Sequence, residues 1–571
     1  MLKTIPEYAI LADTLKAGRS AAVTGVGQIN RSHMIAGLSK DLQKPFAIVC
    51  QDDMTARRIQ EELKCFLGLT APILPGRDLT FYDAAVASKT WEQKRLRQLR
   101  DWSSGAVPIQ ILTWESLSLR TMPWDVLQKA SFTLEVGQEY SLDDLASRLT
   151  AAGYSRCGMV EGPGQFAFRG GIADIFSPGE DRPVRLEFFG DELDTMGYFD
   201  PQTQRRNENT ECVTVLPVGE TQPGLHPRGL GGLCHDLTNL IARQKRRKNV
   251  NELLVTTLSR DLEKYENNLH NPASDRYMAL IYPEMATAAD YIPENALVVL
   301  CDQSSLHRAA RSRSDEMGMQ LDSLLQAGLV AGELCDYVCQ WEDFCAGLKN
   351  KTVLFFDTFG GAAYPEDCPP KQLYPMTAKQ LPGYGGNLEA ACDDVRHYVN
   401  TGFSVLVLAG DERRVAALRE FFAERGIDAA AAKRVGALPE PGHCAVAVGA
   451  FSGGFEYPLS HVAVLTDAMM MQSGFRKARR SKKLPADRKR LASCADLAVG
   501  DLVVHEHHGI GRFAGIVQMR VDGVDKDYIK ICYAGTDTLY VPATQLDLVS
   551  KYIGAGEARP VKLSRMGGAE W

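Results

Sequence analysis

Residues 20–50, SAAVTGVGQINRSHMIAGLSKDLQKPFAIVC, contain two short apolar runs, at 20–25 and 46–50, separated by an amphipathic stretch. A helical pattern follows at 54–67, and another apolar run follows at 109–112. Short apolar runs that alternate with amphipathic stretches are typical of a parallel sheet with helices on both faces. The sequence therefore predicts an α/β fold at the start of the chain, and nucleotide binding is the first function to test.

The turn after the first apolar run departs from the phosphate-binding loop GxxxxGK[ST]. In that loop, glycines let backbone N–H groups hold the phosphates, a lysine neutralises them and a hydroxyl binds Mg²⁺. Here the second glycine and the lysine are missing, and Asp302, after the apolar run 296–300, is the candidate for a Mg²⁺-binding carboxylate. We therefore predict a degenerate nucleotide loop that does not hydrolyse ATP, made of Gly25, Gly27, Gln28, Asn30 and Ser32.

The size and composition of the chain limit the remaining possibilities. A chain of 571 residues exceeds one hydrophobic core and predicts about three to five domains. With 64 basic and 71 acidic residues, the net charge is −7, which excludes a uniformly basic protein that coats DNA. The hydrophobic content of 45% excludes a disordered chain. We expect a multidomain α/β protein.

The same composition bears on location and on metal binding. No apolar stretch reaches the roughly 18–20 residues that span a bilayer, and the first residues lack the pattern of a secretion signal, so we expect a cytoplasmic protein without membrane contact. The 14 cysteines lack the spacing of zinc ligands, and the group His505, His507 and His508 lacks a fourth ligand. We expect reduced thiols and no metal site.

The pattern changes several times along the chain. From residue 131, short strands with Gly- and Pro-marked turns predict an α+β unit inserted into the first sheet. From residue 497, closely spaced short strands predict a small SH3-like β-barrel. The expected domains are 1–130 and 219–364 (two parts of one α/β unit), 131–218 (the insert), 365–470 (a second small α/β unit), 471–496 (a basic linker), 497–553 (the barrel) and 554–571 (a tail).

Two clusters of basic residues could contact nucleic acid. The linker is rich in Lys and Arg and has few apolar residues, which is typical of a solvated connection. The cluster at 243–248 is better explained as an exposed helix face. Weak, nonspecific contact with DNA phosphates remains an alternative. In the linker its candidates are Arg476, Lys477, Arg479 and Arg480.

Within the insert, four runs carry a specific pattern. They are PGQF at 163–166, RGGIADIF at 169–176, PVRLEFFGDE at 183–192 and FDPQTQR at 199–205. This pattern closely resembles the UvrA-binding domain that the excision-repair protein UvrB shares with the Mfd family of transcription-repair coupling factors. The resemblance implies that the first α/β unit is UvrB-like.

The last unit resembles a second known domain. Its runs GDLVVH at 500–505 and HGIGRFAGI at 508–516 are similar to the RNA-polymerase-interaction domain of the Mfd family, which is related to CarD. UvrB lacks this domain and CarD-type regulators lack the insert, so both on one chain indicate the Mfd family. The resemblance also implies an ATP- and Mg²⁺-dependent motor after this domain. We expect this chain to be the half without the motor and to need no cofactor.

The resemblance implies two protein-binding sites and no catalytic residues. In the RNA-polymerase-interaction domain, alternation along the strand 516–521 puts Met519 in the core, whereas the resemblance puts an apolar contact to the partner at or next to Met519, and both readings stay open. The implied contacts to UvrA are Arg169, Arg185 and Phe189, and those to the RNA polymerase β subunit are Ile516, Val517, Met519, Arg520 and Val521.

The leading hypothesis is a monomeric, non-catalytic adaptor that binds the RNA polymerase β subunit and recruits UvrA to stalled transcription. In the intact protein, the motor would use ATP to displace the stalled polymerase. One alternative is a UvrB-like damage-recognition ATPase, against which the altered loop argues. The other is a CarD-like transcription regulator, which would explain residues 497–553 and leave the insert without a role.

Overall fold

A computed structural model describes most of the chain in twelve ranges. They are residues 2–82, 90–178, 180–358, 363–432, 438–451, 453–470, 488–490, 500–505, 509–521, 524–534, 538–542 and 549–552. For residues 4, 90, 432, 488–490, 509, 516, 518–521, 524–528, 542 and 550–552, the backbone alone is described. The predicted DNA contacts in the linker, Arg476 to Arg480, lie outside these ranges.

The first unit contains the predicted parallel sheet. Its strand order is β16-β1-β15-β14-β2-β3, and every neighbouring pair is parallel. The strands are β1 (Ala21–Thr24), β2 (Phe46–Cys50), β3 (Ile109–Thr113), β14 (Leu297–Cys301), β15 (Thr352–Asp357) and β16 (Gln372–Pro375). The structure therefore contains an α/β unit whose second part, with β14 and β15, follows the insert in the sequence. β16 also belongs to this sheet, where it pairs with β1, although it lies in the range 365–470 that was expected to form the second α/β unit.

Helices cover both faces of this sheet because successive strand residues point to opposite sides. Ala21 and Val23 pack in the core formed with α1 (Pro6–Lys16), α2 (Gln28–Leu42) and α3 (Asp53–Leu67). Ala22 packs in the core formed with α4 (Thr90–Ser103) and α11 (Gln303–Gln326). The latter core also contains residues of α5 (Trp114–Ser118), α6 (Trp124–Ala130), α8 (Gly229–Lys245), α9 (Glu252–Glu266), α10 (Met278–Ile281) and α12 (Trp341–Gly347).

The insert is a six-stranded sheet with one helix. Strands β5 (Phe132–Glu135) and β12 (Cys212–Val215) pair with each other, so the chain enters and leaves the insert side by side. One face of the six-stranded sheet packs on α7 (Leu142–Ala151) through a core that includes Leu145, Leu149 and Leu186. The order is β11-β10-β9-β8-β7-β6, with β6 (Ser155–Arg156), β7 (Gln165–Arg169), β8 (Ile172–Ile175), β9 (Val184–Phe189), β10 (Glu192–Phe199) and β11 (Arg206–Asn209).

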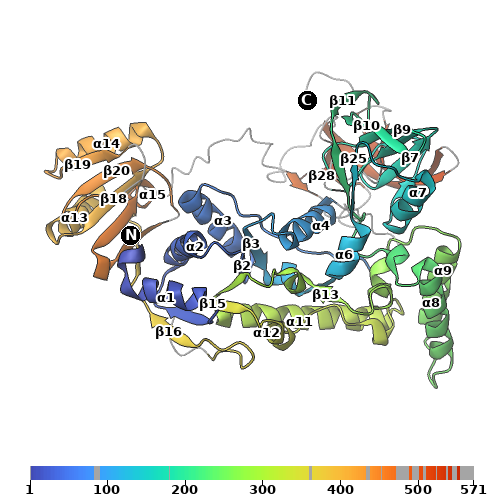
Figure 1. Cartoon of the computed structure of the whole chain (residues 1–571), viewed down its shortest axis with the longest axis horizontal. Coiled ribbons are helices and arrows are strands. Elements are labelled where there is room, and N and C mark those ends of the chain that lie inside the picture. Colours follow the sequence, from blue (N-terminus) through green and yellow to red (C-terminus); the bar gives the residue numbers. More distant parts are fainter. Residues whose placement is uncertain are drawn as a thin grey trace.

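The second α/β unit has a mixed sheet and packs against the first unit. Phe455 and Tyr457 of this unit belong to the same buried core as α2 and α3. The unit lies at the end of the molecule near α1 and α2, and α8 and α9 lie at the opposite end (Figure 1). Its elements are β17 (Lys379–Leu381), α13 (Leu388–Asn400), β18 (Ser404–Ala409), α14 (Glu412–Ala423), β19 (Ala429–Ala432), β20 (Cys444–Val448), β21 (Gly454–Tyr457), β22 (Val462–Thr466) and α15 (Asp467–Met470).

The last unit is an antiparallel sheet in the order β23-β28-β24-β25-β26-β27. No pairing of β23 with β27 closes this sheet among the described residues, so the SH3-like barrel stays a prediction. β23 lies inside the range expected to be the basic linker, where it pairs with β28. The strands are β23 (Arg488–Arg490), β24 (Leu502–His505), β25 (Gly509–Val521), β26 (Val524–Cys532), β27 (Thr538–Pro542) and β28 (Val549–Tyr552).

Candidate functional site

Two of the predicted UvrA contacts, Arg169 and Arg185, converge on one buried carboxylate. Arg169 ends β7, Arg185 lies in β9, and Asp174 lies in β8 between those strands. The side chain of Asp174 is fully buried and accepts hydrogen bonds from Nε (2.7 Å) and Nη2 (2.9 Å) of Arg185 and from Nη2 of Arg169. Bidentate arginine–carboxylate pairs are strong and geometrically specific. The sheet therefore fixes the Arg185 guanidinium without any partner.

Arg185 has further contacts inside the insert. It donates hydrogen bonds to the main-chain and side-chain oxygens of Gln204 (3.2 Å each), and its guanidinium lies 4.6 Å from the centre of the Phe199 ring. The pKa of Arg185 is raised, chiefly because Asp174 accepts its hydrogen bonds. The Arg185 side chain is 17% exposed, whereas that of Arg169 is 46% exposed. Arg169 is therefore the more accessible of the two arginines.

Phe189 presents an aromatic ring to solvent at the end of β9. It is 83% exposed, more than any other large apolar residue in the described part of the chain. Alternate residues of a strand share a face, so Phe189 lies on the same side of β9 as Arg185 and Glu187. Exposed aromatic and arginine side chains are the residue types enriched in protein interfaces. The structure thus brings the three predicted residues to one face of the insert sheet.

Sequence reasoning missed a second polar network on this face. Arg206 donates from Nη1 to Glu187 (3.1 Å) and to the hydroxyl oxygen of Thr195 (3.1 Å), and Thr195 donates to Glu187 (3.3 Å). The alternation of polar and apolar residues in β9 could have found Glu187. It could not have found Arg206, which belongs to β11, two strands away in the sheet.

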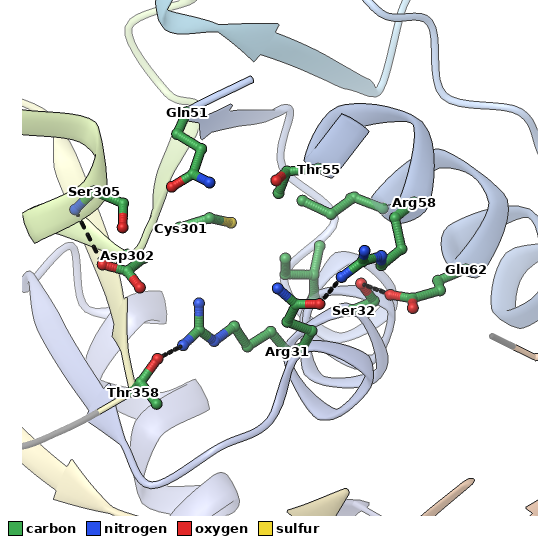
Figure 2. A pocket seen from close by; sticks show the side chains of 13 residues that line it. Arg31, Ser32, Gln51, Thr55, Arg58, Glu62, Cys301, Asp302, Ser305 and Thr358 are labelled. Atoms are coloured by element: carbon green, nitrogen blue, oxygen red, sulfur yellow. Dashed lines mark hydrogen bonds between the residues drawn. The ribbon is translucent and has the colours of Figure 1, made fainter. Parts of the chain in front are cut away.

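Two residues of the predicted degenerate nucleotide loop, Gln28 and Ser32, line a small pocket at the start of α2 (Figure 2), whereas Gly25, Gly27 and Asn30 are not among its lining residues. Within the pattern GxxxxGK[ST], Asn30 stands at the second glycine, Arg31 at the lysine and Ser32 at the hydroxyl position. The Ser32 hydroxyl, which would bind Mg²⁺ in a working loop, donates to Glu62 (2.7 Å). Asp302, the candidate Mg²⁺ ligand, lines the same pocket and accepts a hydrogen bond from the N–H of Ser305 (3.1 Å).

Protein groups fill part of this pocket and pack closely against the loop. Arg31 extends across the pocket and donates from Nη2 to the hydroxyl of Thr358 (2.7 Å; Figure 2). A Cβ added at Gly27 would lie 3.1 Å from the side chain of Gln380, which comes from the second α/β unit. Gly25 is required by packing, because a Cβ there would lie 2.6 Å from the carbonyl oxygen of Met376. The cavity measures about 140 Å³, below the roughly 300–1,000 Å³ of drug-sized ligand sites.

This geometry predicts that the chain does not bind ATP tightly. A ligand present at 100 times its Kd stabilises a protein by about 2.7 kcal/mol. We therefore expect millimolar Mg²⁺–ATP to leave the Tm, measured by differential scanning fluorimetry, unchanged. Sodium sulfate at equal ionic strength is the control for nonspecific salt effects. A rise of several degrees with ATP that sulfate does not produce would contradict this prediction.

The predicted RNA-polymerase contacts lie on β25, and one edge of half of that strand is free among the residues that the structure describes. β24 pairs with β25 only over Gly509–Arg512, whereas β26 pairs with it as far as Val521. Beyond Ala514, β26 is therefore the only described strand that pairs with β25. Val517 is half-buried, and the side chains of Ile516, Met519, Arg520 and Val521 are outside the described set. The orientation of Met519 thus stays open.

The described residues give no sign of a metal site or a membrane span. They contain no group of three or more His, Cys, Asp or Glu side chains placed to hold a metal ion. The cysteines among them are free thiols. His507 and His508 lie outside the described residues. No helix in the described ranges is long and apolar enough to cross a bilayer.

Two stretches of the chain match known domain families. Residues 132–220 match the UvrB interaction domain, and residues 497–553 match the CarD-like/TRCF RID domain. The first match contains the face of the insert sheet that carries Arg169, Arg185 and Phe189, which we call the polar face. The second match contains β25. Together they define a class of protein that carries a repair-type and a transcription-type interaction domain on one chain.

Curated relatives of this class share the name transcription-repair-coupling factor. The chain is 28% identical to that of Bacillus subtilis (strain 168) over 578 residues, which cover 100% of this chain and 48% of the relative. It is 26% identical to that of Staphylococcus haemolyticus over 98% of this chain and 47% of the relative. The chain therefore spans about half the length of these relatives. These findings confirm the resemblance seen in the sequence.

Proposed function

We propose that the chain is the adaptor half of a transcription-repair coupling factor. Its insert binds the repair protein UvrA, and its last sheet binds the β subunit of RNA polymerase. The observation that carries this proposal is that one chain contains both interaction domains and is similar to coupling factors over its whole length. A chain that binds both partners would bring the repair machinery to a stalled polymerase.

The polar face of the insert supports the choice of UvrA contacts. Arg169 and Phe189 are accessible, and Arg185 is held by the buried Asp174. Preorganised arginines lose little side-chain entropy when they bind carboxylates of a partner. We therefore assign Arg169 and Phe189 to direct contact with UvrA, and Arg185 to contact through its exposed edge.

The free edge of β25 supports the choice of the polymerase contact. A strand with unpaired N–H and C=O groups can add to the edge of a partner's sheet, and this mode gives affinity through main-chain hydrogen bonds. The candidate residues Ile516, Val517, Met519, Arg520 and Val521 lie on the half of β25 that has this edge. We propose that this half pairs with a strand of the β subunit.

For the whole protein, we propose an ATP- and Mg²⁺-dependent motor that moves on DNA and displaces stalled polymerase. This proposal rests on the resemblance to the coupling factors. The adaptor half needs no cofactor for its two contacts, and we propose that it acts as a monomer in the cytoplasm with weak, nonspecific affinity for DNA.

Substitution of Met519→Arg is predicted to weaken capture of the β subunit by at least about tenfold, the effect of losing about 1.4 kcal/mol of binding free energy. An arginine at the free edge would put an unpaired charge into an apolar contact. Surface plasmon resonance with immobilised β subunit and, separately, with UvrA measures this effect. Binding of UvrA should be unchanged.

The matched control is Arg512→Gln. Arg512 is exposed on the same strand, at a position paired on both sides. This variant should bind the β subunit like the wild type. If the folded wild-type chain captures neither UvrA nor the β subunit, the adaptor proposal fails. If Met519→Arg keeps its melting temperature and its affinity for the β subunit, the strand assignment fails.

A further inference from the structure

The end of α8 and the turn that follows it carry a dense cluster of cations, which we call the α8 tip. The tip comprises Arg243, Lys245, Arg246, Arg247 and Lys248. All five residues are exposed, and α8 and α9 lie side by side at one end of the molecule (Figure 1). The chain as a whole has a net charge of −7, so the tip is a local reversal of the overall charge.

The tip has little internal neutralisation. Arg243 and Arg247 share one carboxylate, Glu333, at 3.8 and 3.9 Å, and Gln244 also donates to that carboxylate (3.1 Å). Within the described residues, Lys245, Arg246 and Lys248 have no carboxylate within ion-pair distance. Their positive charges are therefore available to an anionic partner.

The fold explains only part of this cluster. Cations in the last turn of a helix interact favourably with the helix dipole, which accounts for Arg243 and Lys245 at the end of α8. The dipole effect falls off within that turn, so it does not account for Arg247 and Lys248. These residues belong to the turn before α9, whose N-cap is Asn251. The cations thus surround the end of α8 instead of following one face.

The surroundings of the tip favour a phosphate backbone over a lipid surface. A helix that binds membranes combines basic residues with a broad apolar face that enters the lipid. Between residues 242 and 253, the only large apolar side chain that is exposed is Leu253. Duplex DNA carries phosphates on both sides of each groove, and cations arranged around a helix end can reach both rows.

We propose that the α8 tip binds the sugar-phosphate backbone of duplex DNA without sequence preference. The α8 tip is then the site of the nonspecific DNA affinity proposed above, and it is separate from the insert and from β25. The inference does not depend on the proposed binding of UvrA or polymerase, because the tip lies on other elements.

The test uses the full chain and a fluorescein-labelled duplex of mixed sequence. The tip variant carries Lys245→Gln, Arg246→Gln and Lys248→Gln, which remove three exposed cations that have no ion pair. Fluorescence anisotropy at about 50–200 mM salt gives the dependence of log K on log salt concentration, whose slope is about −0.9 per phosphate contact. We expect the tip variant to reduce the magnitude of the slope by about 2–3.

The control variant changes the same net charge elsewhere. It carries Lys16→Gln, Arg19→Gln and Lys40→Gln, three exposed cations of the first unit. We expect this variant to keep the wild-type slope, and we expect both variants to keep the wild-type melting temperature. Both variants should capture UvrA and the β subunit as the wild type does. A failure of the proposed DNA contact can therefore be distinguished from a failure of the adaptor proposal.

Three results would overturn the inference. The first is a tip variant whose affinity and salt slope equal those of the wild type. The second is an equal loss in the control variant, which would show an effect of net charge alone. The third is a tip variant that keeps its affinity for DNA and loses binding to phosphatidylserine vesicles, which would assign the tip to an anionic membrane surface.

Discussion

Substitution of Glu220→Ala is expected to lower the free energy of unfolding by about 3–5 kcal/mol, because it breaks a buried ion pair and leaves its partner charged and buried. The side chains of Glu220 and Arg95 are both 0% exposed, and Nε of Arg95 lies 3.0 Å from Oε1 of Glu220. Nε of Arg77 lies 3.7 Å from the other carboxylate oxygen, to which Thr121 donates a hydrogen bond.

Glu220 lies just after the point at which the chain leaves the insert. Glu220 follows the last strand of the insert, whereas Arg95 lies on α4 and Arg77 precedes it in the first unit. Arg77 also donates to Asp275 (2.7 Å), which in turn accepts from the N–H of Thr80 (2.7 Å). The network therefore anchors the point at which the chain leaves the insert within the first α/β unit.

Chemical denaturation followed by circular dichroism measures the loss in Glu220→Ala. The matched control is Glu208→Ala in the insert, since Glu208 and its partner Arg182 are 64% and 41% exposed. Exposed ion pairs contribute about 0–1 kcal/mol, so this variant should remain close to the wild type. Equal free energies of unfolding for Glu220→Ala and Glu208→Ala would show that the network at Glu220 contributes no more to stability than an exposed ion pair.

Local patterns were sufficient to predict several strands and helices of the α/β units. The apolar run predicted at 46–50 is β2 (Phe46–Cys50), and the helix predicted at 54–67 is α3 (Asp53–Leu67). α3 begins at a clear signal, since Asp52 accepts a hydrogen bond from the N–H of Thr55 (2.8 Å). These features depend on neighbours in sequence, which is why the sequence alone identifies them.

Contacts between distant segments could not be predicted in this way. Alternation on a strand predicts a solvated position for Asp174, yet its side chain is fully buried because two arginines from neighbouring strands cover it. The role of Arg31, which stands at the lysine position of the altered loop, could not be predicted either, because its contact with Thr358 joins segments more than 300 residues apart. In both cases the missing information is which strands become neighbours.

Because Asp174 is buried, we expect two variants of the polar face to differ in their stability while both lose affinity for UvrA. Phe189→Ala is expected to weaken binding of UvrA by about 30-fold, the effect of losing a hot-spot contact of about 2 kcal/mol, without change in stability. Arg185→Ala is expected to weaken binding and also to destabilise the insert by about 2–3 kcal/mol. The loss in stability arises because Asp174 stays buried while two of its charge-assisted hydrogen bonds disappear.

Calorimetric titration with UvrA, together with denaturation of each free variant, separates these two contributions. Arg169→Gln is a third variant that removes a charge from the same face and leaves the bidentate pair of Arg185 and Asp174 intact. If Arg169→Gln and Phe189→Ala both weaken binding while both stay as stable as the wild type, the polar face contacts UvrA directly. The opposite result is that only Arg185→Ala weakens binding, and that the loss is no larger than the fraction of unfolded insert in this variant. In that case the face is a structural network, and the UvrA site lies elsewhere on the insert.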